Sequence, residues 1–198
     1  MRTLEEAARE AATCTRCRLS QGRTQVVYGI GHPNADLMFI GEAPGFHEDK
    51  QGEPFVGAAG QLLNRLLSEI EIAREDVYIN NVVLCRPPGN RDPYPDELEA
   101  CKPWLDERIA LVDPVVVVTL GNWATRYILG SSVSISRVRG QRFPWNGRIV
   151  IPTFHPAAVL HGGGESSRQM ASLRADFQEI RAALAERPQP AEEQLGLF

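Results

Sequence analysis

The stretch DLMFIGEAPG, residues 36–45, decides the fold of this chain. Its first half is a short apolar run, Leu37 to Ile40, with the length and composition of a buried β-strand. Its second half places two glycines and a proline around Glu42, and this composition predicts a tight turn. We therefore expect a buried strand over residues 36–40 that ends abruptly in a loop with an acidic side chain.

Strand and helix patterns alternate along the chain on both sides of this stretch. Apolar, β-branched runs predict further strands over residues 77–84, 115–120 and 148–154, and helical patterns occupy residues 3–13, 60–70, 96–111, 122–129 and 166–186. Because the strands are apolar almost throughout, we expect helices on both faces of their sheet. The sequence therefore predicts an α/β fold, a three-layer α/β/α sandwich around a mostly parallel, four-stranded sheet.

Polar loops accompany three of these four predicted strands. They are GEAPG at 41–45, the segment from Asn80 through Pro88, and His155-Pro156 after the last strand. In folds of this class, ligands bind at the carboxyl ends of the parallel strands. We therefore expect these loops to converge on one face of the molecule and to form its site.

Length and composition fit a single globular domain. The chain has 198 residues, of which 43% are hydrophobic and 23% charged, and its formal net charge is −4. This charge excludes a uniformly basic nucleic-acid-binding domain, so an anionic partner needs a local basic patch. Residues 1–13 lack the apolar core of a signal peptide, and no apolar run is long enough to span a bilayer. We expect a cytoplasmic protein without a membrane partner.

The composition changes after Arg187. Residues 188–193 are PQPAEE, which is typical of a solvated linker, and residues 194–198 are the more apolar QLGLF. We therefore expect a folded domain over residues 1–187 and a flexible tail over residues 188–198.

Four cysteines point to a metal site. Cys14 and Cys17 form a C-x-x-C pair, and Cys85 and Cys101 follow at a distance. In a reducing compartment, four cysteines indicate a metal centre more readily than two disulfides, and this set suits zinc and a 4Fe–4S cluster equally. The alternative is that Cys14 and Cys17 are ligands while the other two are ordinary buried cysteines.

Five motifs in a fixed order carry a family resemblance. They are GEAPG at 41–45, PFVG at 54–57, YINNVVLCRPP at 78–88, HPAA at 155–158 and the four-cysteine pattern. Together they resemble the family 4 uracil-DNA glycosylases, the iron–sulfur type of bacteria and archaea, over roughly residues 10–185. The resemblance implies the uracil-DNA glycosylase fold, a 4Fe–4S cluster rather than zinc, and excision of uracil from DNA by hydrolysis of the N-glycosidic bond in base excision repair.

Such an enzyme must extrude the nucleotide and bind its base in a pocket. The resemblance implies that Asn81 recognises uracil, because its carboxamide can accept from N3–H and donate to O4, whereas cytosine presents the reverse pattern. It implies Phe55 as the stacking surface and Glu48 as the wall that excludes the thymine methyl. The backbone around Gly41 and Ala43 can donate directly to the base. From the residues alone, a turn role for Asn81 and a solvated Glu48 remain open.

Two further residues are implied in catalysis. His155 can donate to uracil O2 as negative charge builds on the leaving base, and Glu42 can place the attacking water and stabilise the cationic sugar. In isolation, both side chains would more often be structural. A second hypothesis is a non-catalytic iron–sulfur or zinc DNA-binding module, but such a protein has no need for Glu42, Asn81 and His155 together.

The basic residues are segregated along the chain. Residues 11–35 and 131–152 contain no carboxylate but carry the arginines at 16, 18, 23, 137, 139, 142 and 148. This pattern predicts phosphate binding, with a solvated face as the alternative. By the resemblance, Arg86 and Arg168 also contact DNA, and residues 157–164 form the duplex-probing loop with Val159 or Leu160 as its wedge.

Two signals concern turnover and partners. Relatives that bind uracil-DNA covalently carry a histidine-bearing insertion between the third and fourth cysteines, and this chain has no histidine between Cys85 and Cys101. An enzyme that turns over is therefore expected, and we separately expect it to be a monomer associated with the nucleoid. The tail resembles the peptide by which bacterial repair proteins bind the sliding clamp, and its candidate contact residues are Gln194, Leu195, Leu197 and Phe198.

Overall fold

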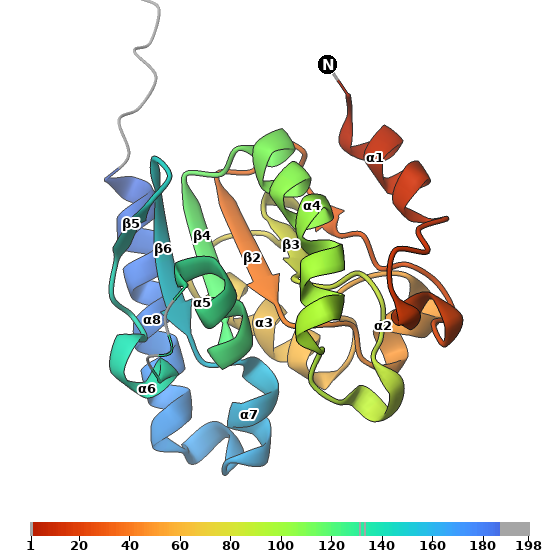
Figure 1. The fold of residues 1–198 in the computed structure, drawn as a ribbon. Helices are drawn as coiled ribbons and strands as arrows, with labels where there is room; N and C mark the ends of the chain where they lie inside the picture. Colours follow the sequence, from red (N-terminus) through yellow and green to blue (C-terminus); the bar gives the residue numbers. More distant parts are fainter. Residues whose placement is uncertain (1, 131, 133, 187–198) are drawn as a thin grey trace, which may run out of the picture.

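Six strands form one mixed sheet at the centre of the molecule, in the order β1-β3-β2-β4-β6-β5 (Figure 1). The structure is a computed structural model that describes residues 2–130, 132 and 134–186. The strands are β1 (Ile30–Gly31), β2 (Leu37–Gly41), β3 (Tyr78–Asn81), β4 (Val116–Leu120), β5 (Phe143–Trp145) and β6 (Arg148–Thr153). The inner pairs β3–β2, β2–β4 and β4–β6 are parallel, whereas β1 and β5 pair antiparallel at the two edges. The predicted α/β class is confirmed, and the predicted count of four strands is corrected to six.

Helices cover both faces of the sheet, with α4 and α5 in front of it and α3 and α8 behind it in Figure 1. The helices are α1 (Leu4–Ala11), α2 (Phe46–Gln51), α3 (Ala58–Glu69), α4 (Pro95–Val112), α5 (Gly121–Leu129), α6 (Ile135–Val138), α7 (Pro156–His161) and α8 (Arg168–Ala185). Short 3₁₀ turns occupy Arg18–Gln21, Arg74–Asp76, Pro88–Asn90 and Gly164–Ser166. Among the described residues, no helix has both the length and the apolarity that crossing a membrane requires.

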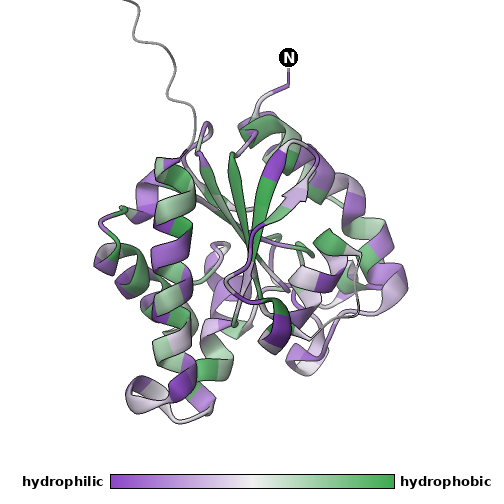
Figure 2. Cartoon of the chain, turned by 90° about the vertical axis from the view of Figure 1, so that its left-hand side faces the viewer, coloured by the Kyte–Doolittle hydropathy of each residue, from purple (hydrophilic) through white to green (hydrophobic). Residues whose placement is uncertain are grey.

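The strands alternate their side chains between two apolar clusters. Met38 and Ile40 of β2 join the α4-side cluster, which includes Trp104 and the two buried cysteines, Cys85 and Cys101. Leu37 and Phe39 join the α8-side cluster, where Phe39 stacks on Phe177 at 5.9 Å between ring centroids. This alternation follows from the two-residue period of a strand, and it lets one sheet support two helix layers. Figure 2 shows largely hydrophobic strands between helices on which hydrophobic and hydrophilic residues alternate.

The segment after β6 differs from the expected loop. Residues 157–164 begin within helix α7, which starts at Pro156 directly after His155. Proline suits this first helical position because its fixed φ angle is helical and its missing N–H has no helical partner to lose. The His155 side chain accepts the N–H of Ala157, so it caps the helix that it precedes.

Candidate active site

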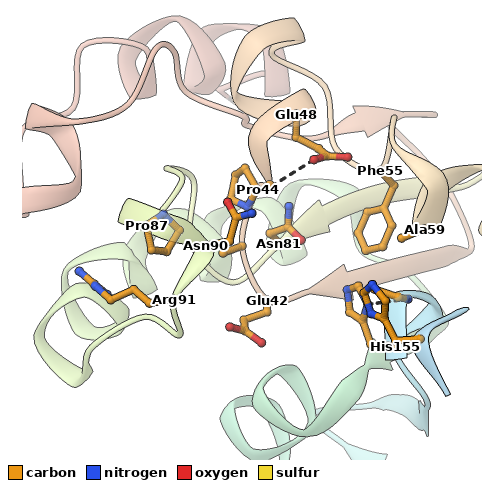
Figure 3. A pocket seen from close by; sticks show the side chains of 14 residues that line it. Glu42, Pro44, Glu48, Phe55, Ala59, Asn81, Pro87, Asn90, Arg91 and His155 are labelled. Carbon is orange, nitrogen blue, oxygen red and sulfur yellow. Dashed lines mark hydrogen bonds between the residues drawn. The ribbon is translucent and has the colours of Figure 1, made fainter. Parts of the chain in front are cut away.

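The carboxyl ends of the parallel strands meet at one cavity of about 420 Å³. Gly41 ends β2 and Asn81 ends β3, and the two residues are partners in the parallel register. Figure 3 shows Phe55, Ala59 and His155 on one side of the cavity and Pro87 and Arg91 on the opposite side, with Asn81 and Glu42 between them. The lining residues are Glu42, Ala43, Pro44, Gly45, Glu48, Phe55, Ala59, Asn81, Pro87, Asn90, Arg91, His155, Ala157 and His161.

Gly41 lies beneath the cavity and is not one of its lining residues. A Cβ atom at this position would lie 2.7 Å from Phe55 Cζ and closer still to Asn81 Oδ1. Such separations are shorter than van der Waals contact, so any larger residue would displace both side chains. The glycine therefore allows Asn81 and Phe55 to approach the end of β2.

Phe55 is held in an uncommon backbone conformation. Its φ is 54°, in the left-handed region, and its side chain is 6% exposed. A non-glycine residue in this region costs about 1–3 kcal/mol and persists only where the surroundings hold it. Gly60 supplies part of that support, because its missing side chain leaves room for the Phe55 carbonyl. The Phe55 ring stacks on His155 with 5.6 Å between centroids and 27° between planes.

His155 is a neutral imidazole at physiological pH. Burial lowers its pKa to about 4, and the nearby Glu48 carboxylate only partly opposes this effect. Its Nδ1 accepts the backbone N–H of Ala157 at 3.2 Å. Because a neutral imidazole carries one proton, the proton is on Nε2, which makes this nitrogen a hydrogen-bond donor.

Glu42 holds its proton far more tightly than an ordinary glutamate. Burial raises its pKa to about 7, and Asp92 adds to the shift through its charge and a side-chain hydrogen bond. Asp92 lies in the loop between Cys85 and Cys101 and is not among the residues predicted from the sequence. Nothing in that loop distinguishes Asp92 from its other acidic residues, since only the folded loop brings it to Glu42.

Glu48 organises the loops around the cavity. Its Oε1 accepts the N–H groups of Val56 and Gly57, both at 3.0 Å, and its Oε2 accepts that of Gly45 at 3.2 Å. Both carboxylate oxygens are therefore committed to the backbone on either side of α2. Glu48 is thus a fixed part of the wall, and the alternative of a freely solvated side chain is wrong.

The four cysteines come from three separate segments of the chain. All four are free thiols. N–H groups point at three of the sulfurs: Trp104 Nε1 lies 3.3 Å from Cys14 Sγ, Arg23 Nη1 3.3 Å from Cys85 Sγ, and the Leu84 N–H 3.4 Å from Cys101 Sγ.

The surroundings of the four cysteines bear on whether these residues can hold a metal centre. Within the described residues, no group of three or more His, Cys, Asp or Glu side chains is arranged to hold a metal ion. Burial raises the pKa of Cys17 and Cys85, and it raises that of Cys101 to about 12. N–H donors aimed at sulfur nevertheless suit thiolates, and a set of four thiols fits an iron–sulfur cluster.

Most of the arginines assigned to phosphate binding already have partners. Arg18 pairs with Asp96, Arg139 with Asp176, Arg142 with Glu179 and Glu186, and Arg148 with Asp113. Arg23 donates to backbone carbonyls and to Cys85, and Arg16 lies over the Trp104 ring. Folding brings acidic residues from elsewhere in the chain to these segments, so they do not form carboxylate-free faces, and phosphate binding by their arginines stays a prediction. Arg137 remains exposed.

The other residues assigned to DNA lie in different surroundings. Arg168 is exposed at the start of α8, and Arg86 donates to Asn90 Oδ1 at 2.7 Å with its guanidinium over the Phe46 ring. Val159 is fully buried in the α8-side cluster, so it is not available as a wedge, and this prediction is wrong. Leu160 is partly buried against the same cluster. The candidate clamp-binding residues, Gln194, Leu195, Leu197 and Phe198, lie outside the described residues.

Comparison with known proteins identifies the family. The sequence model of the Uracil DNA glycosylase superfamily matches residues 28–183. A type-4 uracil-DNA glycosylase of Sulfurisphaera tokodaii is 47% identical over 91% of this chain and 84% of the relative. Type-4 enzymes of Saccharolobus solfataricus and Thermotoga maritima are 43% and 46% identical, over 95% and 84% of this chain and 89% and 88% of the relatives. This chain therefore belongs to the Uracil DNA glycosylase superfamily and, within it, to the type-4 uracil-DNA glycosylases.

Proposed function

We infer that this protein removes uracil from DNA by hydrolysing the N-glycosidic bond and so begins base excision repair. The observation that carries the inference is the meeting of Glu42, Asn81 and His155 around one cavity at the carboxyl ends of the strands. A module that only binds DNA has no use for a partly buried acid, a carboxamide and a neutral imidazole in one pocket.

Recognition of the base falls to Asn81, Phe55 and Glu48 in this proposal. The Asn81 carboxamide pairs with N3–H and O4 of uracil, and a cytosine in the same position leaves buried polar groups unpaired. Uracil stacks on Phe55, whose position the Gly41 and Gly60 contacts support. Glu48 excludes the thymine methyl as part of a wall that its three backbone hydrogen bonds keep rigid. The backbone of Ala43, which lines the cavity, is a further proposed contact, whereas Gly41 acts by leaving room for Asn81 and Phe55.

Cleavage of the N-glycosidic bond leaves negative charge on uracil and positive charge on the sugar, and His155 and Glu42 act on these charges. The C1′–N1 bond breaks with its electron pair passing to uracil, and Nε2–H of His155 donates to O2 as negative charge develops there. A neutral donor suits this role because its low pKa leaves the proton in place at neutral pH without adding a full buried charge. Water forms the new bond to C1′, and the Glu42 carboxylate accepts the proton that this water loses.

We assign Cys14, Cys17, Cys85 and Cys101 to a 4Fe–4S cluster. When bound, the cluster supplies iron–thiolate bonds that tie the N-terminal segment to the loop after β3 and to α4. The N–H donors to three sulfurs and the type-4 relatives support this assignment. The purified protein is expected to be brown, with absorbance near 400 nm and about four irons per chain. A colourless protein with stoichiometric zinc would overturn it.

Contacts with the DNA backbone are proposed for Arg86 and Arg168, with Leu160 as the residue that probes the duplex. Arg168 is exposed and no ion pair involves it among the described residues. Arg86 neighbours the cavity through Asn90. These positions allow a uracil-containing strand to reach the pocket while one monomer contacts the flanking phosphates.

We further propose that residues 1–187 act as one catalytic domain and that residues 188–198 tether it to a sliding clamp. The QLGLF sequence behind a proline-containing polar linker supports this assignment. Deleting residues 194–198 is expected to abolish co-elution with the clamp and to leave activity on short oligonucleotides intact. Unchanged co-elution would remove the proposed partner.

The enzyme is tested with an oligonucleotide that carries one uracil. Incubation with the protein followed by alkali is expected to break the strand at the uracil, whereas a matched strand with cytosine or thymine stays intact. A uracil strand that is bound but survives alkali would favour the non-catalytic DNA-binding hypothesis instead.

A further inference from the structure

Arg108 is a completely buried cation on α4, with 0% of its surface exposed. Its three donor nitrogens each reach a backbone carbonyl: Nε donates to Trp104 at 3.0 Å, Nη1 to Tyr28 at 2.7 Å and Nη2 to Asn81 at 3.0 Å. Its guanidinium also lies 5.3 Å from the centre of the Tyr28 ring. No carboxylate forms an ion pair with it in the part of the chain that the structure describes.

Neutral carbonyls satisfy the hydrogen bonds of Arg108 but leave its charge unbalanced. A buried, unpaired charge is strongly unfavourable in a protein interior, so a negative group nearby is expected. The ionisable groups whose charges act on Arg108 are Cys101 and the phenols of Tyr28, Tyr78 and Tyr127. Burial raises the pKa of all three phenols, which therefore stay neutral. Of these groups in the described part of the chain, this leaves Cys101, which would carry a negative charge as a thiolate bound to a metal centre.

The position of Arg108 on α4 places it between the cysteines and the base-recognition residue. Cys101 lies seven residues earlier on the same helix, which is about two turns and therefore the same face. Trp104, between them, donates through Nε1 to Cys14 Sγ and accepts through its carbonyl from Arg108. Arg108 in turn binds the carbonyl of Asn81, whose side chain lines the cavity. A continuous set of hydrogen bonds thus joins a candidate ligand to the pocket.

We propose that Arg108 is a positioning residue that couples the cysteine site to uracil recognition. Its charge balances the thiolates of the loaded centre, and its hydrogen bond to the Asn81 carbonyl fixes the residue that recognises the base. The proposal rests on the assignments of the cluster and of Asn81 made above. The new element is that Arg108, which lies outside the pocket and touches neither DNA nor metal, sets both the charge balance at the cysteine site and the position of Asn81.

Two substitutions separate the charge of Arg108 from its hydrogen bonds. Arg108→Gln removes the charge and keeps an N–H donor, whereas Arg108→Lys keeps the charge and loses the planar fork. Arg126→Gln is the matched control, because Arg126 is an exposed arginine on α5 with no part in the site. The measurements are iron content, the midpoint potential of the cluster by film voltammetry, and the ratio of kcat/KM for uracil over cytosine in iron-loaded protein.

The potential is expected to follow the charge. It shifts to more negative values in Arg108→Gln, because adding an electron is harder without the neighbouring cation, and it stays at the parent value in Arg108→Lys and Arg126→Gln. Uracil discrimination depends on the planar guanidinium and its hydrogen bond to the Asn81 carbonyl. The ratio of kcat/KM for uracil over cytosine is therefore expected to fall about tenfold in both Arg108→Gln and Arg108→Lys. If Arg108→Gln loses its iron or fails to fold, Arg108→Lys still tests the proposal. It is expected to keep the midpoint potential of the unsubstituted protein and to discriminate less well between uracil and cytosine.

Other outcomes overturn the proposal. A lowered melting temperature in the position-108 variants with parent potential and parent discrimination would show a structural role only. A changed potential in Arg108→Lys would equally contradict the charge assignment. The unsubstituted protein separates this failure from that of the proposed function: if it is colourless or leaves the uracil strand intact, the cluster or the activity is wrong before any variant is compared.

Discussion

Gly41 and Asn81 are register partners at the carboxyl ends of β2 and β3, and the absence of a side chain at Gly41 sets how closely the Asn81 carboxamide approaches. The same gap accommodates the Phe55 ring. One hydrogen atom in place of a methyl group thus permits the geometry of both side chains that we propose to contact the base.

Gly41→Ala is therefore expected to lower kcat/KM for uracil by at least about tenfold, because a displacement of both side chains misplaces the base. Steady-state kinetics on a single-uracil oligonucleotide measures the effect. Gly22→Ala is the control, since a Cβ at Gly22 meets nothing within 4 Å. Equal losses in the two variants would contradict a specific role for Gly41.

Asn81→Asp is expected to weaken the preference for uracil over cytosine by about 1–3 kcal/mol, since the carboxylate loses the donor that O4 requires. Competition between uracil and cytosine strands measures the preference directly. Asn80→Asp serves as the comparison, because Asn80 is buried next to Asn81 and donates to the Phe39 carbonyl rather than to the cavity. Unchanged selectivity in Asn81→Asp would refute the recognition role.

The pH dependence of cleavage is expected to reflect Glu42. Its carboxylate accepts a proton in the proposed reaction, so kcat/KM rises with pH as Glu42 ionises around its pKa of about 7. Asp92→Asn removes a negative neighbour and shifts this rise to lower pH. Glu99→Gln, an exposed substitution on α4, leaves it in place. Identical profiles for the parent and Asp92→Asn would show that Asp92 does not influence Glu42.

Glu42 also affects stability. Its pKa is raised from 4.5 in a free side chain to about 7 in the fold, so the folded state holds the proton more tightly over this range. The contribution of Glu42 to the free energy of unfolding therefore falls as the pH rises from about 4.5 to about 7 and is level above that. The Glu42→Gln variant has no ionisable group at this position, so its free energy of unfolding does not decrease for this reason as the pH rises. Urea denaturation is expected to show a stability advantage for Glu42→Gln at about pH 8 that disappears near pH 4.5.

Salt dependence distinguishes arginines that bind phosphate from those that hold the fold together. Arg168→Ala is expected to reduce the slope of log K against log salt by about one, as the loss of one phosphate contact requires. Arg142→Ala breaks the pairs with Glu179 and Glu186 and leaves the slope unchanged. Fluorescence anisotropy with uracil-containing DNA at several salt concentrations provides the slopes. Equal slopes for the parent and Arg168→Ala would remove Arg168 from the interface.

The sequence predicts the four inner strands because each is an apolar run of ordinary strand length. It does not reveal β1 and β5, which have two and three residues and depend on an existing edge for their pairing. The motifs also identify the pocket residues, since loops at the ends of neighbouring parallel strands meet by geometry.

Contacts between residues that are far apart in the sequence could not be predicted from local sequence patterns. Arg139 and Asp176 lie 37 residues apart, and no local pattern connects them. Asp92 reaches Glu42 through the path of a proline-rich loop, and Val159 is buried because a short helix packs against α3 and α8. In each case, the partner or the burial of the residue depends on tertiary packing, which the local composition does not specify.

The division of the core into two clusters has a consequence for protein that lacks iron. Cys85 and Cys101 belong to the α4-side cluster, with Cys14 and Cys17 packed against it, whereas the described members of the α8-side cluster include no cysteine. In a chelated sample, amide hydrogens of α1 and α4 would exchange quickly with solvent while those of α3 and α8 remain protected. The proposed cluster therefore implies that the α8-side layer keeps its order without iron, whereas the order of α1 and α4 depends on it.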